Sequence, residues 1–212
     1  MSRTGLWDSH AHLDDEAFNE DREQLIAQLE QDMDGIVNPG CDAASSAVAV
    51  ELAEKYPFIY AAVGWHPENL KGIPADYLQQ LAEWAQHPKV VAIGEIGMDL
   101  YWDKTFLKEQ QFVFEQQIQW ALEYELPIVI HCREAFDYIY NVLKPYKTSP
   151  LKGIFHSFTG TLEEALRILE FPDFSIGING VVTFKKSNLP EVLSSIPLAR
   201  IVLETDSPYL TP

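Results

Sequence analysis

The stretch Leu6-Trp7-Asp8-Ser9-His10-Ala11-His12-Leu13 begins with apolar residues and ends in two histidines. Side chains at positions i and i+2 of a strand lie on the same face. The stretch therefore predicts a short strand whose last inward-facing side chains are His10 and His12. Two imidazoles on one face are half of a metal site. Such pairs also occur on exposed strands, so this prediction depends on what the rest of the chain places beside them.

The same arrangement, an apolar run followed by polar side chains, recurs along the chain between segments with helical spacing. The apolar runs are short and rich in Val, Ile and Leu, as expected for parallel strands covered by helices. We expect strands over residues 6–12, 35–40, 58–64, 89–93, 127–130, 153–155, 174–179 and 200–203. We expect helices over residues 16–32, 43–56, 76–86, 105–125, 134–144 and 162–169, and a short helical turn over 190–196. Asp42 is a suitable N-cap for the second helix.

About eight strands alternating with helices predict an α/β fold, the (β/α)8 TIM barrel. An open doubly wound sheet is the structural alternative, and it is disfavoured because no Gly-rich nucleotide-binding turn follows any strand. A chain of 212 residues can bury one sizeable core. We therefore expect residues 1–212 to form a single domain.

The composition is that of a globular protein with a formal net charge of −17. This negative charge repels polyanions from most of the surface. It is still compatible with an enzyme that binds one end of a nucleic acid in a local pocket, because bound metal ions can supply positive charge there. No apolar run has the roughly 20 residues that a membrane helix needs, and no secretory signal is seen. Cys41 and Cys132 are far apart and have no CxxC spacing, so we do not expect a disulfide framework. We expect a cytoplasmic location, where thiols stay reduced.

Polar side chains follow most of the apolar runs, and five of the six histidines are among them. In a parallel barrel all these strand ends meet at one rim, where barrel enzymes carry their catalytic groups. A single histidine there is more often structural, and a single carboxylate more often a helix cap. A convergent group, however, would bury like-charged acids at a cost that divalent ions offset. We therefore predict a metal site built from His10, His12, Glu95, His131, His156 and Asp206.

This set of ligands suits two divalent ions in one chain. It exceeds what one tetrahedral zinc ion requires, and the two oxygens of Glu95 can bridge a pair of ions. Imidazole and carboxylate without thiolate are compatible with zinc, manganese or magnesium.

Further side chains near this rim have two readings each. Arg133 shares a face with His131 and can clamp an anionic oxygen of the substrate, or form a surface salt bridge. His66 can contact substrate or phosphate, or be structural. Glu204 shares a face with Asp206 and can polarise a neighbouring group or fill a barrel layer. The aromatic residues Trp65, Tyr101 and Trp102 can stack on a base, although aromatic residues in loops more often only pack.

Six segments together resemble the TatD family of metal-dependent deoxyribonucleases, in order, spacing and flanking residues. They cover nearly the whole chain: Asp8–Leu13, Val63–Pro67, Gly94–Asp99, His131–Ala135, His156–Gly160 and Glu204–Leu210. The resemblance implies a TIM barrel of the amidohydrolase type that carries one to three divalent ions. It also implies hydrolysis of phosphodiester bonds in DNA, typically from a 3′ end, with single-stranded DNA or 3′ ends as substrate.

The resemblance also implies roles for individual residues. His10 and His12 would hold one ion and His131 and His156 the other, with Glu95 bridging. Asp206 would complete the site and orient or deprotonate the attacking water. The expected catalytic residues are Asp206, Glu95, Glu204 and His66, and the expected substrate-binding residues are Arg133 and His66.

One difference from the family concerns the segment after the eighth strand. Family members usually continue through a loop into a closing helix, whereas this sequence stops at Pro212. We therefore expect the closing C-terminal helix to be missing and apolar surface to be exposed on the last strand.

Two alternatives stay open. A related amidohydrolase would act on a C–N bond or another ester, although Glu95 stands where many such enzymes carry a modified lysine. A barrel that binds metal without turnover is the non-enzymatic alternative. The sequence does not specify an oligomeric state, and a monomer is compatible with it.

Overall fold

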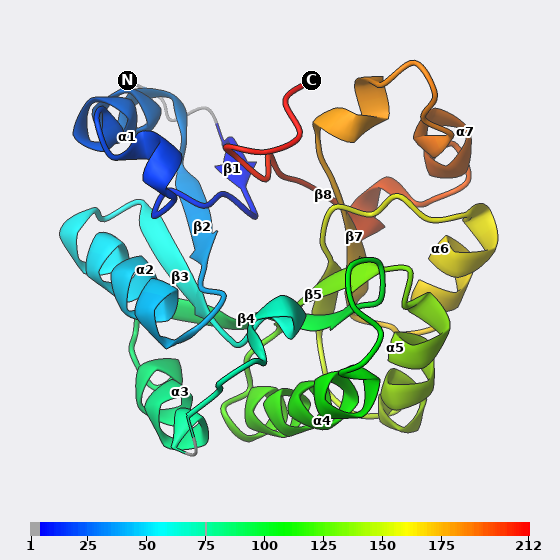
Figure 1. The fold of residues 1–212 in the computed structure, drawn as a ribbon. Coiled ribbons are helices and arrows are strands. Elements are labelled where there is room, and N and C mark those ends of the chain that lie inside the picture. Colours follow the sequence, from blue (N-terminus) through cyan, green and yellow to red (C-terminus); the bar gives the residue numbers. More distant parts are fainter. Residues whose placement is uncertain (1–4, 75) are drawn as a thin grey trace.

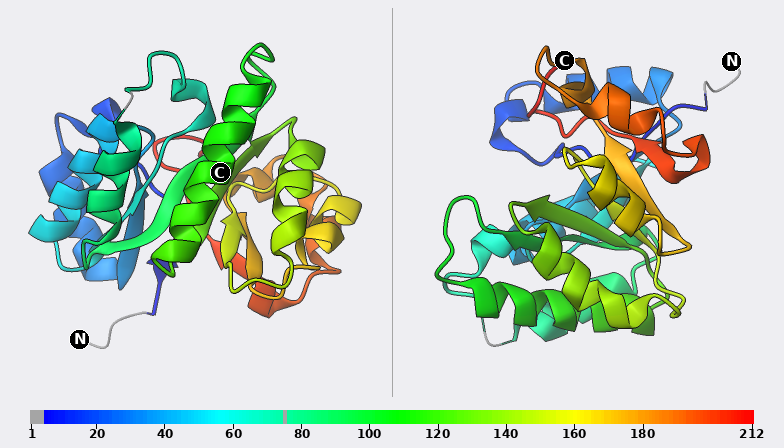
Figure 2. Two further views of the ribbon diagram at one scale, coloured as in Figure 1. Left: turned by 90° about the horizontal axis from the view of Figure 1, so that it is seen from below. Right: turned by 90° about the vertical axis from the view of Figure 1, so that its right-hand side faces the viewer.

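A computed structural model describes residues 5–74 and 76–212 of the chain. Its centre is one eight-stranded parallel sheet in which the strands follow one another in sequence order, β1 to β8. Figure 1 and Figure 2 show the sheet curved into a barrel with helices on the outside. The strands are β1 Trp7–Asp8, β2 Gly35–Pro39, β3 Ile59–Val63, β4 Val90–Asp99, β5 Ile128–Arg133, β6 Gly153–Phe155, β7 Phe174–Ile178 and β8 Ile201–Leu203. The predicted TIM barrel is confirmed.

Helices connect the strands and follow one another around the barrel (Figure 1). They are α1 Arg22–Asp32, α2 Ala43–Lys55, α3 Tyr77–Ala85, α4 Leu107–Glu123, α5 Phe136–Leu143, α6 Leu162–Ile168 and α7 Leu189–Leu193. Short 3-10 turns add η1 Glu16–Phe18, η2 Pro67–Asn69, η3 Lys144–Tyr146, η4 Gly180–Thr183 and η5 Leu198–Arg200. The expected cap of α2 is present, because the Asp42 side chain accepts a hydrogen bond from the backbone N–H of Ser45.

The barrel is nearly closed where its first and last strands meet. The backbone N–H of Ser9 donates to the carbonyl of Leu203 at 3.1 Å, and the N–H of Asp206 donates to the carbonyl of His10 at 2.8 Å. The Asp8 carboxylate adds hydrogen bonds from the backbone N–H and the hydroxyl of Thr205. The two ends of the sheet are thus held together on the side where the predicted ligands lie.

The bounds of several elements differ from the prediction. Strand β1 has only two residues, so His10 and His12 follow it in an extended loop; the N–H of Ala11 still donates to the carbonyl of Val37. The helix expected over residues 16–32 divides into η1 and α1. Strands β4 and β5 run further than expected and contain Glu95, His131 and Arg133, because residues beyond the first apolar run still pair with the neighbouring strand.

The outer side of the last strand is open, as expected. Leu203 in β8 is 61% exposed and Trp7 in β1 is 48% exposed. Among the described residues no helix follows β8. No helix in the part of the chain that the structure describes has the length and the apolar character needed to cross a membrane.

Candidate metal centre

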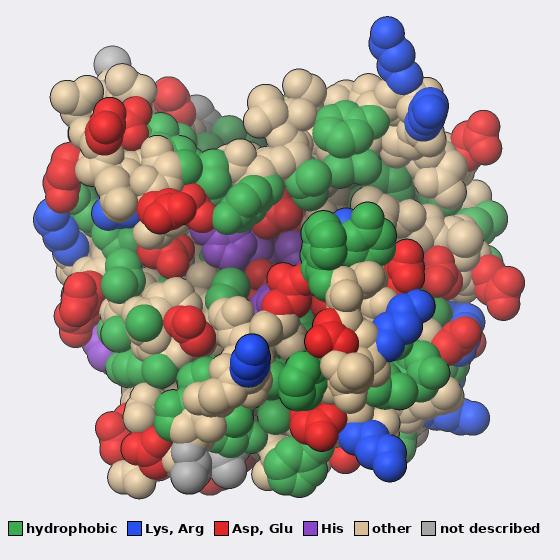
Figure 3. Space-filling view, viewed as in Figure 1, with side chains coloured by type: hydrophobic (Ala, Val, Ile, Leu, Met, Phe, Trp, Pro, Cys, Tyr) green, Lys and Arg blue, Asp and Glu red, His purple; other side chains and the backbone are tan. Residues whose placement is uncertain are grey.

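The candidate centre lies at the carboxyl ends of the strands, as the barrel topology requires. Figure 3 shows histidine side chains at the bottom of a hollow, between acidic and hydrophobic side chains. This hollow is a cavity of about 910 Å³. The structure brings together all six predicted ligands: His10 and His12 from the loop after β1, Glu95 from β4, His131 from β5, His156 directly after β6 and Asp206 after β8.

One group of donor atoms gathers around the Oε2 atom of Glu95. The Nε2 atoms of His10 and His12 lie 3.2 Å apart, and they lie 3.3 and 3.7 Å from Oε2. Both nitrogens also lie 3.6 Å from Oδ1 of Asp206. Two ligand atoms about 2.1 Å from one ion in tetrahedral geometry lie about 3.4 Å apart. The spacing of these four atoms therefore fits a shared ion.

A second group gathers around the other oxygen of Glu95. Oε1 lies 2.9 Å from Nδ1 of His131, 2.9 Å from Nε2 of His156 and 3.3 Å from Nε2 of His66. The two oxygens of one buried carboxylate thus face two separate sets of imidazoles. This is the arrangement that a carboxylate bridging two ions requires.

The electrostatics of the centre follow from the burial of Glu95. Burial, the largest influence, favours protonation of this carboxyl, but the charges of His156 and His66 and the hydrogen bonds from His10 and His131 hold its pKa well below the usual value. Burial favours the neutral form of His156 and so lowers its pKa, but the charges of Glu95 and Glu204 and the hydrogen bonds with them together outweigh burial and raise that pKa well above normal. A negative charge is therefore retained here, and positive charge is drawn to it.

Asp99 is a functional candidate that the sequence interpretation missed. This buried carboxylate at the end of β4 lies 2.9 Å from Nε2 of His131, through Oδ2. Gln110 of α4 fixes the backbone of Asp99 by hydrogen bonds to its N–H and its carbonyl. A carboxylate that accepts from one ring nitrogen leaves the other nitrogen as a lone-pair donor. Nδ1 of His131, which faces Glu95, is thereby prepared to bind a cation.

His66 also lies in the cavity, but it presents Nε2 to Glu95, whereas His131 presents Nδ1. Nδ1 of His66 accepts a hydrogen bond of 3.2 Å from the backbone N–H of Glu68 in η2. A neutral His66 therefore carries its proton on Nε2, the atom that faces Glu95. The side chain is better suited to donate a hydrogen bond to an anionic oxygen than to bind an ion.

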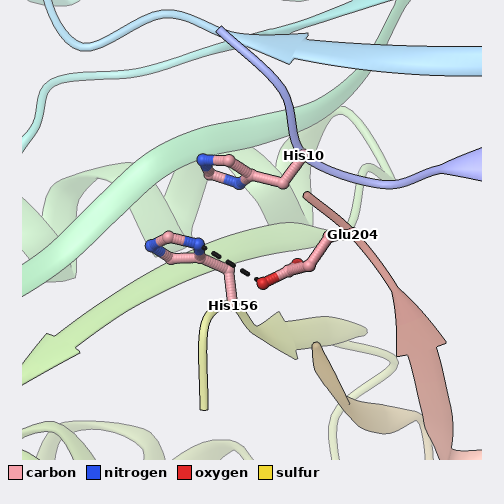
Figure 4. A group of neighbouring side chains, drawn as sticks. All are labelled: His10, His156 and Glu204. Atoms are coloured by element: carbon pink, nitrogen blue, oxygen red, sulfur yellow. Dashed lines mark ion pairs between the residues drawn. The ribbon is translucent and has the colours of Figure 1, made fainter. Parts of the chain in front are cut away.

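Glu204 lies beside the rings of His10 and His156, which stack with their centroids 4.0 Å apart (Figure 4). Figure 4 shows these three side chains and the ion pair between Glu204 and Nδ1 of His156, which is 3.7 Å long. The Glu204 carboxylate also accepts hydrogen bonds from the backbone N–H of Ser157 and, at 3.5 Å, from the hydroxyl of Ser9. Its contacts make it a support for His156 rather than a group that points into the cavity.

Asp206 has a backbone conformation that few side chains other than glycine adopt. Its φ angle is 62°, in the left-handed region, and its N–H and carbonyl are both hydrogen bonded, to His10 and Tyr209. Such conformations persist where surrounding contacts enforce them, and they gather at functional sites. The turn directs the Asp206 carboxylate back toward the histidines of the β1 loop.

Arg133 reaches the cavity from the end of β5, and its guanidinium lies on two aromatic rings. The guanidinium carbon is 3.8 Å from the ring centroid of Tyr101 and 5.2 Å from that of Trp102. Trp65, by contrast, is buried, and its indole N–H donates to the carbonyl of Asn69. Of the three predicted aromatic residues, only Tyr101 and Trp102 are exposed.

A smaller cavity of about 370 Å³ lies beside the centre between the loops that follow β5 and β6. It is lined by Cys132, His156 and side chains of α5 and α6. Burial raises the pKa of the Cys132 thiol to about 12. A thiol of this kind is a neutral packing group at neutral pH.

Comparison with known proteins gives one consistent result. The family described as TatD related DNase matches residues 7–212. A Bacillus subtilis protein named as an uncharacterized metal-dependent hydrolase, YabD, is 41% identical over 98% of this chain and 82% of its own length. A protein of Pantoea sp. named 3′-5′ ssDNA/RNA exonuclease TatD is 35% identical over 98% of this chain and 81% of its own length. The crystal structure of the TatD homolog YjjV from Escherichia coli superposes with a TM-score of 0.90 at 33% identity, covering 97% of this chain and 80% of that one.

Proposed function

The chain belongs to the family of TatD-related DNases, and from this premise we propose that it removes nucleotides from the 3′ end of DNA by hydrolysing phosphodiester bonds with divalent metal ions. The coarser activity is that of a hydrolase: YabD is named a metal-dependent hydrolase, the Pantoea relative is named an exonuclease, and the family is described as TatD related DNase. The proposal narrows this activity to one substrate and one direction.

The observation that best supports the proposal is that the two carboxylate oxygens of Glu95 face two different groups of donor atoms. Oε2 faces His10 and His12, and Oε1 faces His131 and His156. Two ions held a few ångströms apart stabilise the attacking and the leaving oxygen of an in-line displacement at phosphorus. The donor set contains imidazoles and carboxylates only, which suits zinc, manganese or magnesium.

Bound at these donors, divalent ions would polarise a phosphoryl oxygen and lower the pKa of a water molecule. The chain's own residues do the rest. Asp206 orients the water and accepts its proton, because its carboxylate faces the first donor group. His66 donates a hydrogen bond from Nε2 to the phosphate, and Arg133 pairs with the neighbouring phosphate oxygen.

The partner of this site is thus one strand end of DNA, bound as substrate. The proposal needs no membrane and no second subunit, because the donors in both groups come from one chain. We place the activity in the cytoplasm, where thiols such as Cys41 and Cys132 stay reduced.

The test is a nuclease assay with a 5′-labelled single-stranded DNA and added magnesium, manganese or zinc. The proposal expects a ladder of products that shortens from the 3′ end and disappears with chelator. The Glu95→Gln variant should remove this activity, because an amide cannot bridge two cations. Glu109→Gln on the exposed surface of α4 is the matched control and should cleave like the unchanged protein.

Two results would contradict the proposal. An intact oligonucleotide in every metal, with metal binding shown separately, would remove phosphodiester hydrolysis. A change in base composition without a change in length would instead point to C–N bond hydrolysis, the chemistry of a deaminase.

A further inference from the structure

The loop after β4 presents two exposed aromatic side chains beside the candidate metal centre. Tyr101 is 47% exposed and Trp102 is 68% exposed. Their ring centroids lie 4.7 Å apart with the planes at 85°. Rings as exposed as these gain little of the favourable free energy that burial of an aromatic side chain normally gives. A ring placed in this way beside a catalytic cavity needs an explanation other than packing.

Arg133 connects these rings to the cavity. Its guanidinium lies over both rings, and it forms no ion pair with a carboxylate of residues 5–74 or 76–212. Arg133 and Trp102 both line the large cavity that contains Glu95 and Asp206. A stacked guanidinium keeps its outward N–H groups free for an anion.

The loop is fixed to the metal centre by one carboxylate. Oδ1 of Asp99 accepts hydrogen bonds from the backbone N–H groups of Tyr101 and Trp102 at 2.9 and 3.4 Å. Oδ2 of the same side chain faces His131 at 2.9 Å. The aromatic rings and the imidazole therefore share an anchor, and their separation is set before any substrate arrives.

The side chains that line the cavity do not form a row of cations that could bind the phosphates of a nucleic-acid backbone. Among the described residues that line it, Arg133 is the only lysine or arginine. The carboxylates that line it are Asp14, Asp15, Asp42, Glu68, Glu95 and Asp206. Proteins that bind nucleic acid mainly through phosphates need many cations. This cavity must therefore gain affinity for a polyanion in another way.

We propose that Trp102, supported by Tyr101 and Arg133, is a stacking platform for a base next to the scissile phosphodiester. The indole stacks on the base, and the guanidinium takes the adjacent phosphate oxygen. Stacking has little sequence preference, because every base has a π-face. A base within a duplex is already stacked and paired, so it is not available to the platform.

This inference rests on the proposed function, but it can be tested apart from cleavage. The first probe is a 5′-fluorescein oligothymidylate whose 3′ phosphorothioate linkages resist hydrolysis. The second probe is the same strand with abasic residues on both sides of the terminal linkage. Binding of each is measured by fluorescence anisotropy with magnesium present. We expect the base-bearing strand to bind about 10-fold more tightly than the abasic strand.

Variants assign that preference to the platform. Trp102→Ala should bind both strands equally, with the affinity for the abasic strand unchanged. Trp102→Phe should keep most of the preference, because a phenyl ring still stacks. Phe112→Ala, which removes another exposed aromatic side chain from α4, should behave like the unchanged protein. A preference that survives in Trp102→Ala, an absent preference, or no binding at all would overturn the platform.

Cleavage of unmodified strands separates the two proposals. Hydrolysis of an abasic end without any preference for bases would leave the nuclease function standing and the platform refuted. If the protein prefers base-bearing strands in binding but hydrolyses no strand in any metal, the platform stands and the nuclease function is refuted. With both correct, blunt duplex ends should be cleaved about 10-fold more slowly than single-stranded ends, since their bases must first unpair.

Discussion

The Asp99 carboxylate lies 2.9 Å from Nε2 of His131, on the side of the ring opposite to Glu95. The proton shared with Asp99 determines which ring nitrogen is free to act as a donor toward the centre. Burial favours the protonated form of Asp99, but the hydrogen bond and charge of His131, together with the hydrogen bonds from the backbone N–H groups of Tyr101 and Trp102, outweigh burial and lower the pKa of Asp99. The carboxylate therefore stays ionised and acts as a fixed acceptor.

Replacing Asp99 by asparagine should weaken metal binding. The amide keeps an acceptor for the loop N–H groups, but it can turn its NH₂ toward His131, which moves the ring proton to Nδ1. We expect a loss of about 10- to 100-fold in metal affinity, the range seen for such supporting groups. Competition with a chelating dye measures this. An affinity within twofold of the unchanged protein would show that Asp99 does not set the tautomer.

Removing metal should lower the thermal stability of the folded chain. An ion that binds only the folded state adds about 2.7 kcal/mol at a free concentration 100 times its Kd. Differential scanning calorimetry with and without chelator should therefore show a Tm that rises with metal concentration. In Glu95→Gln this dependence should be small, because the amide carries no negative charge and keeps only one of the two oxygens that face the donor groups. A Tm that metal does not change would count against a built metal site.

Substitutions of Glu204 should lower the free energy of unfolding by different amounts, depending on whether the new side chain keeps a hydrogen-bond acceptor. Glu204→Ala leaves the partly buried Ser157 N–H without its acceptor, which we expect to cost about 1 kcal/mol of unfolding free energy. Glu204→Gln keeps an acceptor oxygen and should lose less. Urea unfolding of both variants makes the comparison, and equal losses would contradict this role for the hydrogen bond.

Both thiols should react slowly in the folded protein. Burial raises the pKa of Cys132 to about 12 and that of Cys41 well above its usual value. A rise of three pKa units lowers the thiolate fraction near pH 8 roughly 1,000-fold, and the reactive fraction returns only as the pH approaches the raised pKa. A disulfide-exchange reagent should therefore label the folded chain slowly and the urea-unfolded chain rapidly. Fast labelling of either thiol in the folded chain would refute this.

Binding of single-stranded DNA should depend only weakly on salt. With Arg133 as the only cationic side chain among the described residues that line the cavity, the slope of log K against log salt concentration should be about −0.7. Arg133→Ala should bring the slope close to zero, and Arg133→Lys should restore it. Anisotropy titrations at several salt concentrations give the slope. A steep dependence would reveal cationic contacts outside this cavity.

Much of the fold was predictable from sequence because helices and strands alternate with clear boundaries. Asp42 illustrates this, because a short acid directly before an alanine-rich run is a strong N-terminal signal, and the cap is present. The lengths of the strands were harder to predict from the sequence. The prediction that the fourth strand ends before Glu95 was wrong, because Ile96 and Met98 continue the buried face and pair with β5.

The convergence of the six candidate ligands was predictable from their positions after apolar runs, while their roles as ligands stay a prediction. Asp99 was missed because the strand was ended too early. Residues 95, 97 and 99 share a face by alternation, and that spacing was the signal that could have found it. The tautomer of His66 lies beyond sequence, because it depends on the turn that brings the Glu68 N–H to Nδ1.

The hydrogen bond between the Asp206 N–H and the His10 carbonyl joins residues that lie almost the whole chain apart. On the ribosome, the first histidines emerge long before the last aspartate is made. The six candidate ligands come together only after the eighth strand has closed against the first, so we expect metal ions to bind the folded barrel and not a chain that is still being made.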